Sequence, residues 1–189
     1  MRNLLLESLP SSLEIGGRKY RIDTDFRTWL SLNEALLNKA GQRVIMQHII
    51  KLFRDDIPSD VDALIAAVGW FLQCGEEVKD EKKRSKRVFS YSYDSDYIIS
   101  AFQEFYSIDL MRTRYMHWWK FNLLLGTISG DCELKERIRY RSINVVKIKD
   151  AAERRRIRKI QAQMRCRETN RSAMKRSRQY FRRWQYGTG

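Results

Sequence analysis

Tyr93 to Phe121 read YDSDYIISAFQEFYSIDLMRTRYMHWWKF, and this stretch decides the fold because its aromatic residues are dense and ordered. In its first half, apolar side chains recur every three or four residues, the period of one helix face. Asp94 or Asp96 is placed to cap that helix. A turn is expected at residues 107–110, and a second helix after it. The spacing predicts a helical hairpin with aromatic facing sides. Its residues are Tyr97, Ile98, Ala101, Phe102, Phe105, Tyr115, Trp118, Trp119 and Phe121.

This arrangement resembles the gene-product-fifteen family of temperate phages that infect Gram-positive bacteria. The shared pattern is an acidic-aromatic start, an F-x-x-x-Y-x-I-D-L turn and an H-W-W-K-F helix. The matching residues are Asp96, Tyr97, Phe102, Tyr106, Ile108, Asp109, Leu110, His117, Trp118, Trp119, Lys120 and Phe121. Further similarity includes Tyr140-Arg141-Ser142, residues 147–150 and 153–155, and Trp70 to Gly75, so the resemblance spans most of residues 20–165.

The resemblance implies a function in phage tail assembly. Genes of this family lie between the tail-tube and tape-measure genes, a position that implies a tail assembly chaperone. The implied partners are the tape-measure and tail-tube proteins, with an upstream chaperone as a further candidate. Nothing in the residues themselves indicates chaperoning.

Composition limits the fold and the compartment. The chain has 189 residues, 43% of them apolar, with two prolines and nine glycines, which favours long helices over a loop-rich sheet protein. Its three cysteines lie far apart and lack metal-binding spacing, which is typical of reduced thiols in a cytosol. No stretch is typical of a secretory signal or a membrane span. We therefore expect a protein of the host bacterial cytoplasm.

A small hairpin and three helices are predicted before residue 76. Gly16-Gly17 separates two short strand patterns and suits a two-residue turn. Thr24 or Asp25 is placed to cap the first helix, and Asp60 to cap the third. The apolar stripe expected to face the core on the third helix consists of Val61, Leu64, Ile65, Val68, Phe71 and Leu72.

The excess positive charge lies mainly at the C-terminal end. From Asp150 onward there are 13 Lys and Arg against 3 Asp and Glu, a net +10; the remainder has 24 against 20, a net +4, and together they give +14. A final long helix is expected to begin near Asp150, with a narrow apolar stripe.

The fold class predicted is mainly α: a helical bundle with a small N-terminal β-hairpin and a long basic C-terminal helix. The predicted regions are 1–75 (hairpin plus helices), 76–90 (charged linker), 91–149 (aromatic helical hairpin region) and 150–189 (basic helix and tail).

The sequence favours neither an enzyme nor a cofactor or metal site. Only His48 and His117 could act as histidine bases or ligands, and no cysteine or carboxylate has a metal-binding spacing to either. His48 lies in an apolar stripe and is expected to be a core histidine. For His117 a structural hydrogen bond is favoured over catalysis. Base, nucleophile and orienting group cannot be placed together.

Two functions remain from the sequence. The first is a non-enzymatic tail assembly chaperone whose contacts are made by the aromatic hairpin and the last helix. Adjacent residues on a helix point about 100° apart, so Trp118 and Trp119 are either both core or one is an exposed binding residue. The partner-binding candidates are Tyr97, His117, Trp118, Trp119 and Lys120.

The alternative is a nucleic-acid-binding accessory protein that acts through its basic arm. Arginines interleaved with aromatic residues suit phosphate contacts and base stacking. The same arm could bind an acidic protein, because guanidinium groups match carboxylates as well as phosphates, or be only a solvated helix face. The nucleic-acid-binding candidates are Arg154, Arg155, Arg158, Lys159, Arg165, Arg182, Arg183 and Trp184.

Overall fold

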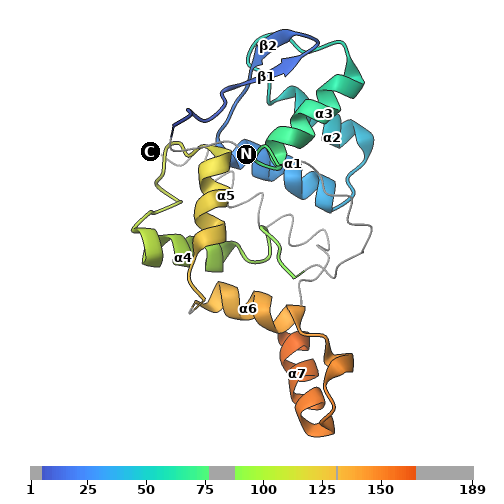
Figure 1. Cartoon of the computed structure of the whole chain (residues 1–189), viewed down its shortest axis with the longest axis vertical. Coiled ribbons are helices and arrows are strands. Elements are labelled where there is room, and N and C mark those ends of the chain that lie inside the picture. Colours follow the sequence, from blue (N-terminus) through green and yellow to red (C-terminus); the bar gives the residue numbers. More distant parts are fainter. Residues whose placement is uncertain (1–5, 77–87, 131, 165–189) are drawn as a thin grey trace, which may run out of the picture. The chain divides into compact units, whose positions relative to one another are not determined.

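The structure is a computed structural model that describes residues 6–76, 88–130 and 132–164. Over these residues it is mainly helical with a small antiparallel hairpin near the N-terminus, which confirms that part of the predicted fold class (Figure 1). No described helix has the length and apolar character needed to cross a membrane. The elements are β1 (Ser12–Ile15), β2 (Arg18–Arg21), α1 (Phe26–Leu37), α2 (Gln42–Ile50), α3 (Val61–Leu72), α4 (Ser95–Tyr106), α5 (Trp118–Thr127), α6 (Glu133–Ser142), the 3₁₀-helix η1 (Val145–Lys147) and α7 (Ala151–Gln163).

The chain forms two compact units. Unit 1 comprises Met1–Lys82 and Arg114–Gly126, and unit 2 comprises Lys83–Thr113 and Thr127–Gly189. The boundary after Lys82 falls within the predicted linker, most of which lies outside the described residues. The chain returns to unit 1 at Arg114, within the predicted region of residues 91–149.

Unit 1 begins with the predicted hairpin. β1 and β2 pair antiparallel with Ile15 opposite Arg18, so the loop between them is Gly16-Gly17. Both glycines have positive φ, +59° and +76°, the conformation that a tight two-residue turn requires. β1 packs against α3, and its Leu13 and Ile15 side chains are buried.

The first and third helices of unit 1 start at the predicted caps. Asp25 accepts a hydrogen bond from the Arg27 amide, and Asp60 accepts one from the Ala63 amide. Each carboxylate satisfies an amide that has no partner within its helix.

The predicted stripe on α3 is only partly correct. Leu64, Val68 and Phe71 are buried, but Val61 and Ile65 are half exposed.

The core of unit 1 is built from stacked rings. Trp29 and Phe71 lie 4.2 Å apart between ring centroids, and Phe26 stacks on Phe121 at 4.6 Å. The indole N–H of Trp29 donates to the carbonyl of Asp23, so its one polar group is satisfied in the core. The largest fully buried side chains of this unit are Trp29, Trp118, Phe71, Phe121, Leu13, Leu32, Leu52 and Leu64.

The second aromatic helix differs from the prediction in its start and in its packing. α5 begins at Trp118, and Tyr115 lies before it in an extended segment. The backbone of that segment pairs with the entry to α1: Phe26 N–H donates to Met116 and Trp118 N–H donates to the carbonyl of Thr24. The rings that α5 buries pack against α1 and α3 in unit 1, whereas α4 belongs to unit 2.

Unit 2 contains α4, α6, η1 and α7, with α6 in contact with both α4 and α7. α4 ends at the predicted turn, where Ser107 adopts positive φ and the Asp109 side chain accepts hydrogen bonds from the amides of Met111 and Arg112. α7 begins where predicted, since Asp150 accepts a hydrogen bond from the Glu153 amide. Residues 165–189, which the prediction assigned to a longer helix and tail, lie outside the described residues.

A buried ion pair joins the segments of unit 2. The Arg141 guanidinium donates to both oxygens of Asp94, at 2.7 and 2.8 Å, and both side chains are almost fully buried. The same guanidinium donates to the backbone carbonyls of Val88 and Met164, and the Ser90 amide donates to Asp94. Asp94 occupies the N-cap position of α4 but makes no capping hydrogen bond, because its carboxylate binds Arg141 instead.

Replacing Asp94 by Asn should destabilise unit 2 by about 3–5 kcal/mol, because the Arg141 charge then stays buried without a counter-charge. The measurement is urea unfolding followed by far-ultraviolet circular dichroism. Glu136→Gln is the matched control: it removes the exposed partner of Arg139 on the same helix and should cost less than about 1 kcal/mol. Equal effects of the two substitutions would contradict the role given to the buried pair.

Candidate functional site

The two tryptophans of the H-W-W-K-F motif are both buried, with 1% and 3% of Trp118 and Trp119 exposed. Their indole N–H groups donate to two carbonyls at the C-terminal end of α3: Trp118 to Leu72 at 3.0 Å and Trp119 to Phe71 at 2.9 Å. The last carbonyls of a helix have no partner inside it, and the Trp118 indole supplies one for Leu72. The Phe71 carbonyl also accepts the Cys74 amide at 3.0 Å, so the Trp119 indole adds a second hydrogen bond there. Of the two interpretations of this pair, the structure gives the core, and neither ring lies on the surface.

Gly75 fits the Trp119 ring. It has φ +81°, and a Cβ added there would lie 2.8 Å from Cη2 of Trp119. Its amide donates to the carbonyl of Trp70, which closes the C-terminal end of α3. Trp70 also packs edge-on against Trp119, at 5.4 Å between ring centroids. Two motifs far apart in sequence, residues 70–75 and 117–121, therefore form one structural unit.

His117 is held by two hydrogen bonds. Its Nε2 lies 3.0 Å from the carbonyl of Pro10, and the Trp119 amide donates to its Nδ1 at 3.1 Å. Nδ1 must be unprotonated to accept, so Nε2 carries the proton and donates to Pro10. Burial lowers the pKa of His117, against the smaller effect of the Pro10 hydrogen bond. The favoured structural hydrogen bond is thus present, and it fixes the N-terminal segment to the start of α5.

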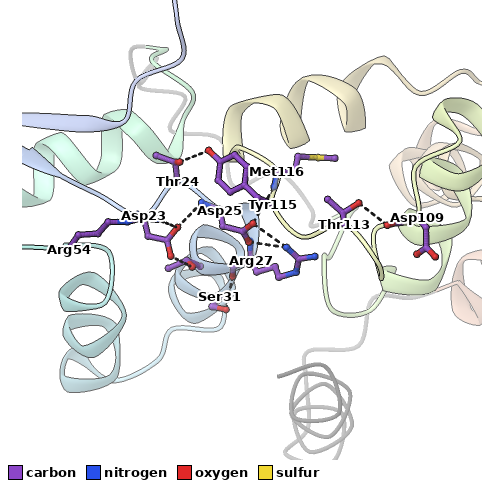
Figure 2. Close-up of polar contacts among 11 residues, drawn as sticks. Asp23, Thr24, Asp25, Arg27, Ser31, Arg54, Asp109, Thr113, Tyr115 and Met116 are labelled. Atoms are coloured by element: carbon purple, nitrogen blue, oxygen red, sulfur yellow. Dashed lines mark hydrogen bonds and ion pairs between the residues drawn. The ribbon is translucent and has the colours of Figure 1, made fainter. Parts of the chain in front are cut away.

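A pocket of about 420 Å³ lies beside His117 in unit 1. It is lined by Leu9, Ser11, Thr24, Tyr115, Met116, His117 and Lys120. The hydroxyls of Thr24 and Tyr115 lie 2.7 Å apart and are hydrogen-bonded (Figure 2). Lys120 is exposed and forms no ion pair with any described residue. The pocket therefore combines apolar walls with one available cation.

Asp25 holds the segments that line this pocket in place through its hydrogen bonds. Its carboxylate receives the Arg27 guanidinium and the Met116 amide as well as the Arg27 amide (Figure 2). Asp23 accepts hydrogen bonds from the Asp25 amide and the Thr28 hydroxyl. These contacts hold residues 23–25 and 115–117 side by side, so the pocket is a fixed feature of unit 1.

Tyr97, the remaining partner-binding candidate, belongs to unit 2. Its ring is half-buried beneath the Arg137 guanidinium, which lies 4.0 Å from the ring centroid. A cation over an aromatic face is a stabilising contact within the unit. Of the five candidates, the structure brings His117 and Lys120 together at the pocket and places Trp118 and Trp119 in the core.

The outer side of α3 is an apolar surface that the sequence analysis did not identify. Val61 is 50% exposed and Ile65 53%, and Asp62 is the one charged residue of the helix. Soluble helices ordinarily carry polar residues opposite their buried stripe. The signal was present in the sequence, because Leu64, Val68 and Phe71 alone make a complete core stripe and leave Val61 and Ile65 unassigned.

The basic residues of helix α7 are of two kinds: one makes hydrogen bonds within unit 2, and others are exposed. Arg154 donates to the carbonyls of Ile148 and Lys149, so it fixes the preceding turn. Arg155, Arg158 and Lys159 are exposed, lie on one face at spacings of three and four, and form no ion pair with a described residue. The other nucleic-acid-binding candidates, Arg165, Arg182, Arg183 and Trp184, lie outside the described residues.

Burial shifts the pKa values of two further groups, Cys74 and His48. The Cys74 thiol has its pKa raised to about 12, mainly by burial and secondarily by Glu76, so it is not a nucleophile at neutral pH. Burial, with a smaller effect of Lys51, lowers the pKa of His48. Within the described part of the chain, no group of three or more His, Cys, Asp or Glu side chains could hold a metal ion.

Comparison with known proteins gives one match. The family model described as Bacteriophage Gp15 protein matches residues 5–166, which is most of the chain. No curated protein sequence and no solved structure matches the chain.

Gly75→Ala should destabilise unit 1 by about 1–3 kcal/mol, because alanine is strained at this φ and its Cβ would overlap Trp119. Urea unfolding followed by tryptophan fluorescence measures the loss. Gly69→Ala, inside α3 with open space around the added Cβ, is the control and should stabilise by roughly 0.5–1 kcal/mol. A Gly75→Ala protein as stable as the parent would rule out the tight Gly75–Trp119 fit.

The stability of unit 1 should fall as the pH drops from 7.5 to 5.5. The pKa of folded His117 is below its ordinary value of 6.5, so below about pH 6.5 the unfolded chain takes up a proton that the folded chain does not. His117→Gln should lower stability at pH 7.5 but reduce the pH dependence. His48→Gln is the control, and it should retain the part of the pH dependence of stability that comes from His117. An unchanged pH dependence in His117→Gln would show that His117 does not titrate as described.

Proposed function

Because the chain belongs to the bacteriophage Gp15 protein family, we propose that it is a non-enzymatic tail assembly chaperone. Family membership indicates a phage structural or morphogenesis protein, and this is the observation that carries the proposal. In the proposed role the protein binds the tape-measure protein in the host cytoplasm and keeps it soluble while tail-tube subunits assemble around it.

The exposed apolar side of α3 supports a binding role. A protein that keeps a long helical partner soluble needs an apolar surface of its own that stays accessible until the partner arrives. Val61 and Ile65 provide such a surface on a helix whose buried stripe is firmly packed. Packing of Leu64, Val68 and Phe71 keeps this surface in place without help from a partner.

The pocket beside His117 supports the same role at a second place in unit 1. Its apolar walls suit an apolar side chain, and Lys120 suits a neighbouring carboxylate. Trp118 and Trp119 then serve indirectly: they hold the start of α5 and the end of α3 in position. Their replacement would disturb partner binding by unfolding unit 1, so they are unsuitable as binding probes.

The second candidate function is nucleic-acid binding, and the free cations of α7 favour it. Arg155, Arg158 and Lys159 present three adjacent positive charges with no described acidic partner. Each phosphate contact made by such a group adds to the salt dependence of binding.

Co-expression with the tape-measure protein of the same phage separates the two functions. If the chaperone proposal is correct, affinity purification of this chain should recover the tape-measure protein at moderate salt and also at high salt, because apolar contacts survive screening. Recovery of nucleic acid alone, lost at high salt and lost in an Arg155→Gln, Arg158→Gln, Lys159→Gln variant, would favour the second candidate. Failure to recover the tape-measure protein at either salt concentration would contradict the proposed function.

A further inference from the structure

The outer side of α3 forms a ridge. Val61, Ile65 and Gly69 follow one another at a spacing of four, so they lie along one face of the helix. A Cβ built on Gly69 would meet no atom within 4 Å, so the ridge has a notch that faces open space. The distance between two packed helices depends on the side chains at their contact. The ridge therefore suits a second helix that approaches closely at Gly69.

The charge around this ridge is negative, in contrast to the chain as a whole. Residues 55–76 contain five acidic residues and no basic residue, although the net charge of the chain is +14. Asp55 and Asp56 are paired with Arg21 and Arg18. The acidic groups that remain are Asp60 and Asp62 at the start of α3 and Glu76 beyond its end. The apolar ridge is thus bounded at both ends by carboxylates.

Two occupants fit an acidic-bounded apolar ridge: a partner helix with basic flanks, or the chain's own basic segment, residues 165–189. The family match ends at residue 166, so nearly all of that segment lies outside the part shared with the family. The ridge lies inside the shared part. Because the family match includes the ridge and leaves out nearly all of the basic segment, we favour a partner over the chain's own segment.

We propose that the Val61–Ile65–Gly69 ridge binds an amphipathic helical segment whose apolar stripe is flanked by Lys or Arg. This inference rests on the proposed function, in which the segment belongs to the tape-measure protein. The apolar stripe of the partner packs on Ile65 and over the Gly69 notch. Its basic residues lie near Asp60 and Asp62 at one end of the ridge and near Glu76 at the other, so opposite charges meet at both ends of the contact.

The test uses the full-length protein and overlapping synthetic peptides that cover the tape-measure protein of the same phage. A synthetic peptide of residues 165–189 is included as the competing occupant. The peptides bound by the wild-type chain should have an apolar heptad pattern with Lys or Arg flanks. Ile65→Ser should weaken their binding at least tenfold, and Asp62→Lys should weaken it several-fold, with a smaller salt dependence.

Matched controls exist in unit 2. Val146→Ser changes another exposed aliphatic residue, and Asp96→Lys reverses another exposed acidic residue in the first turn of a helix. Neither should alter peptide binding. Circular dichroism and the urea midpoint establish that each variant is folded, and light scattering gives the mass of the wild type and of Ile65→Ser.

Each of the other possible results would contradict a specific part of the inference or of the proposed function. Tape-measure peptides that bind wild type and Ile65→Ser equally would place the contact elsewhere and leave the proposed function standing. Bound peptides with acidic flanks would contradict the partner chemistry. Binding of the 165–189 peptide alone would assign the ridge to the chain itself, and a smaller mass for Ile65→Ser would assign it to a second copy. If no tape-measure peptide binds the wild type, both the inference and the proposed function fail.

Discussion

The two indole hydrogen bonds at the C-terminal end of α3 are the constraint on which unit 1 depends. Trp118 and Trp119 reach Leu72 and Phe71 across 46 and 48 residues of sequence, and both contacts are removed from water. The Leu72 carbonyl accepts from Trp118, and the Phe71 carbonyl, which also accepts the Cys74 amide, gains a second hydrogen bond from Trp119. The end of α3 and the start of α5 therefore specify each other. This explains why two aromatic residues are adjacent in the chain: each has its own carbonyl, and the ring of Trp119 also packs against Gly75.

Unit 2 uses a charged version of the same arrangement. Arg141 satisfies Asp94 and two backbone carbonyls at once, so a single side chain brings together the segment before α4, helix α6 and the end of α7. The desolvation cost of burying this ion pair is offset only because each polar atom has a hydrogen-bond partner. The last described residue, Met164, is held at this point, and the free cations of α7 stand on the helix that leads to it.

Local signals in the sequence predicted the elements of the fold well. Gly16-Gly17 predicted the hairpin and Asp25, Asp60 and Asp150 the helix starts, because turns and caps depend on residues close in the chain. Partners were not predictable. The sequence contains more apolar residues in α3 than the core stripe of Leu64, Val68 and Phe71 needs, but periodicity alone assigned Val61 and Ile65 to that stripe as well. Asp94 was one of two candidate caps, with Asp96, because the sequence does not show that Arg141 lies beside Asp94. For the site, the sequence motif located His117 and Lys120. The acidic-bounded ridge could be recognised only from the structure, which shows how far each residue of α3 is buried.

The central claim is that the tryptophan pair is an internal support and that the outer side of α3 makes the partner contact. Amide hydrogen exchange, compared between the free protein and its complex with the tape-measure protein, tests this most directly. The account predicts that binding adds protection in residues 61–72, while residues 118–121 are already protected in the free protein and change little. Added protection confined to residues 151–163, with none in α3, would contradict it.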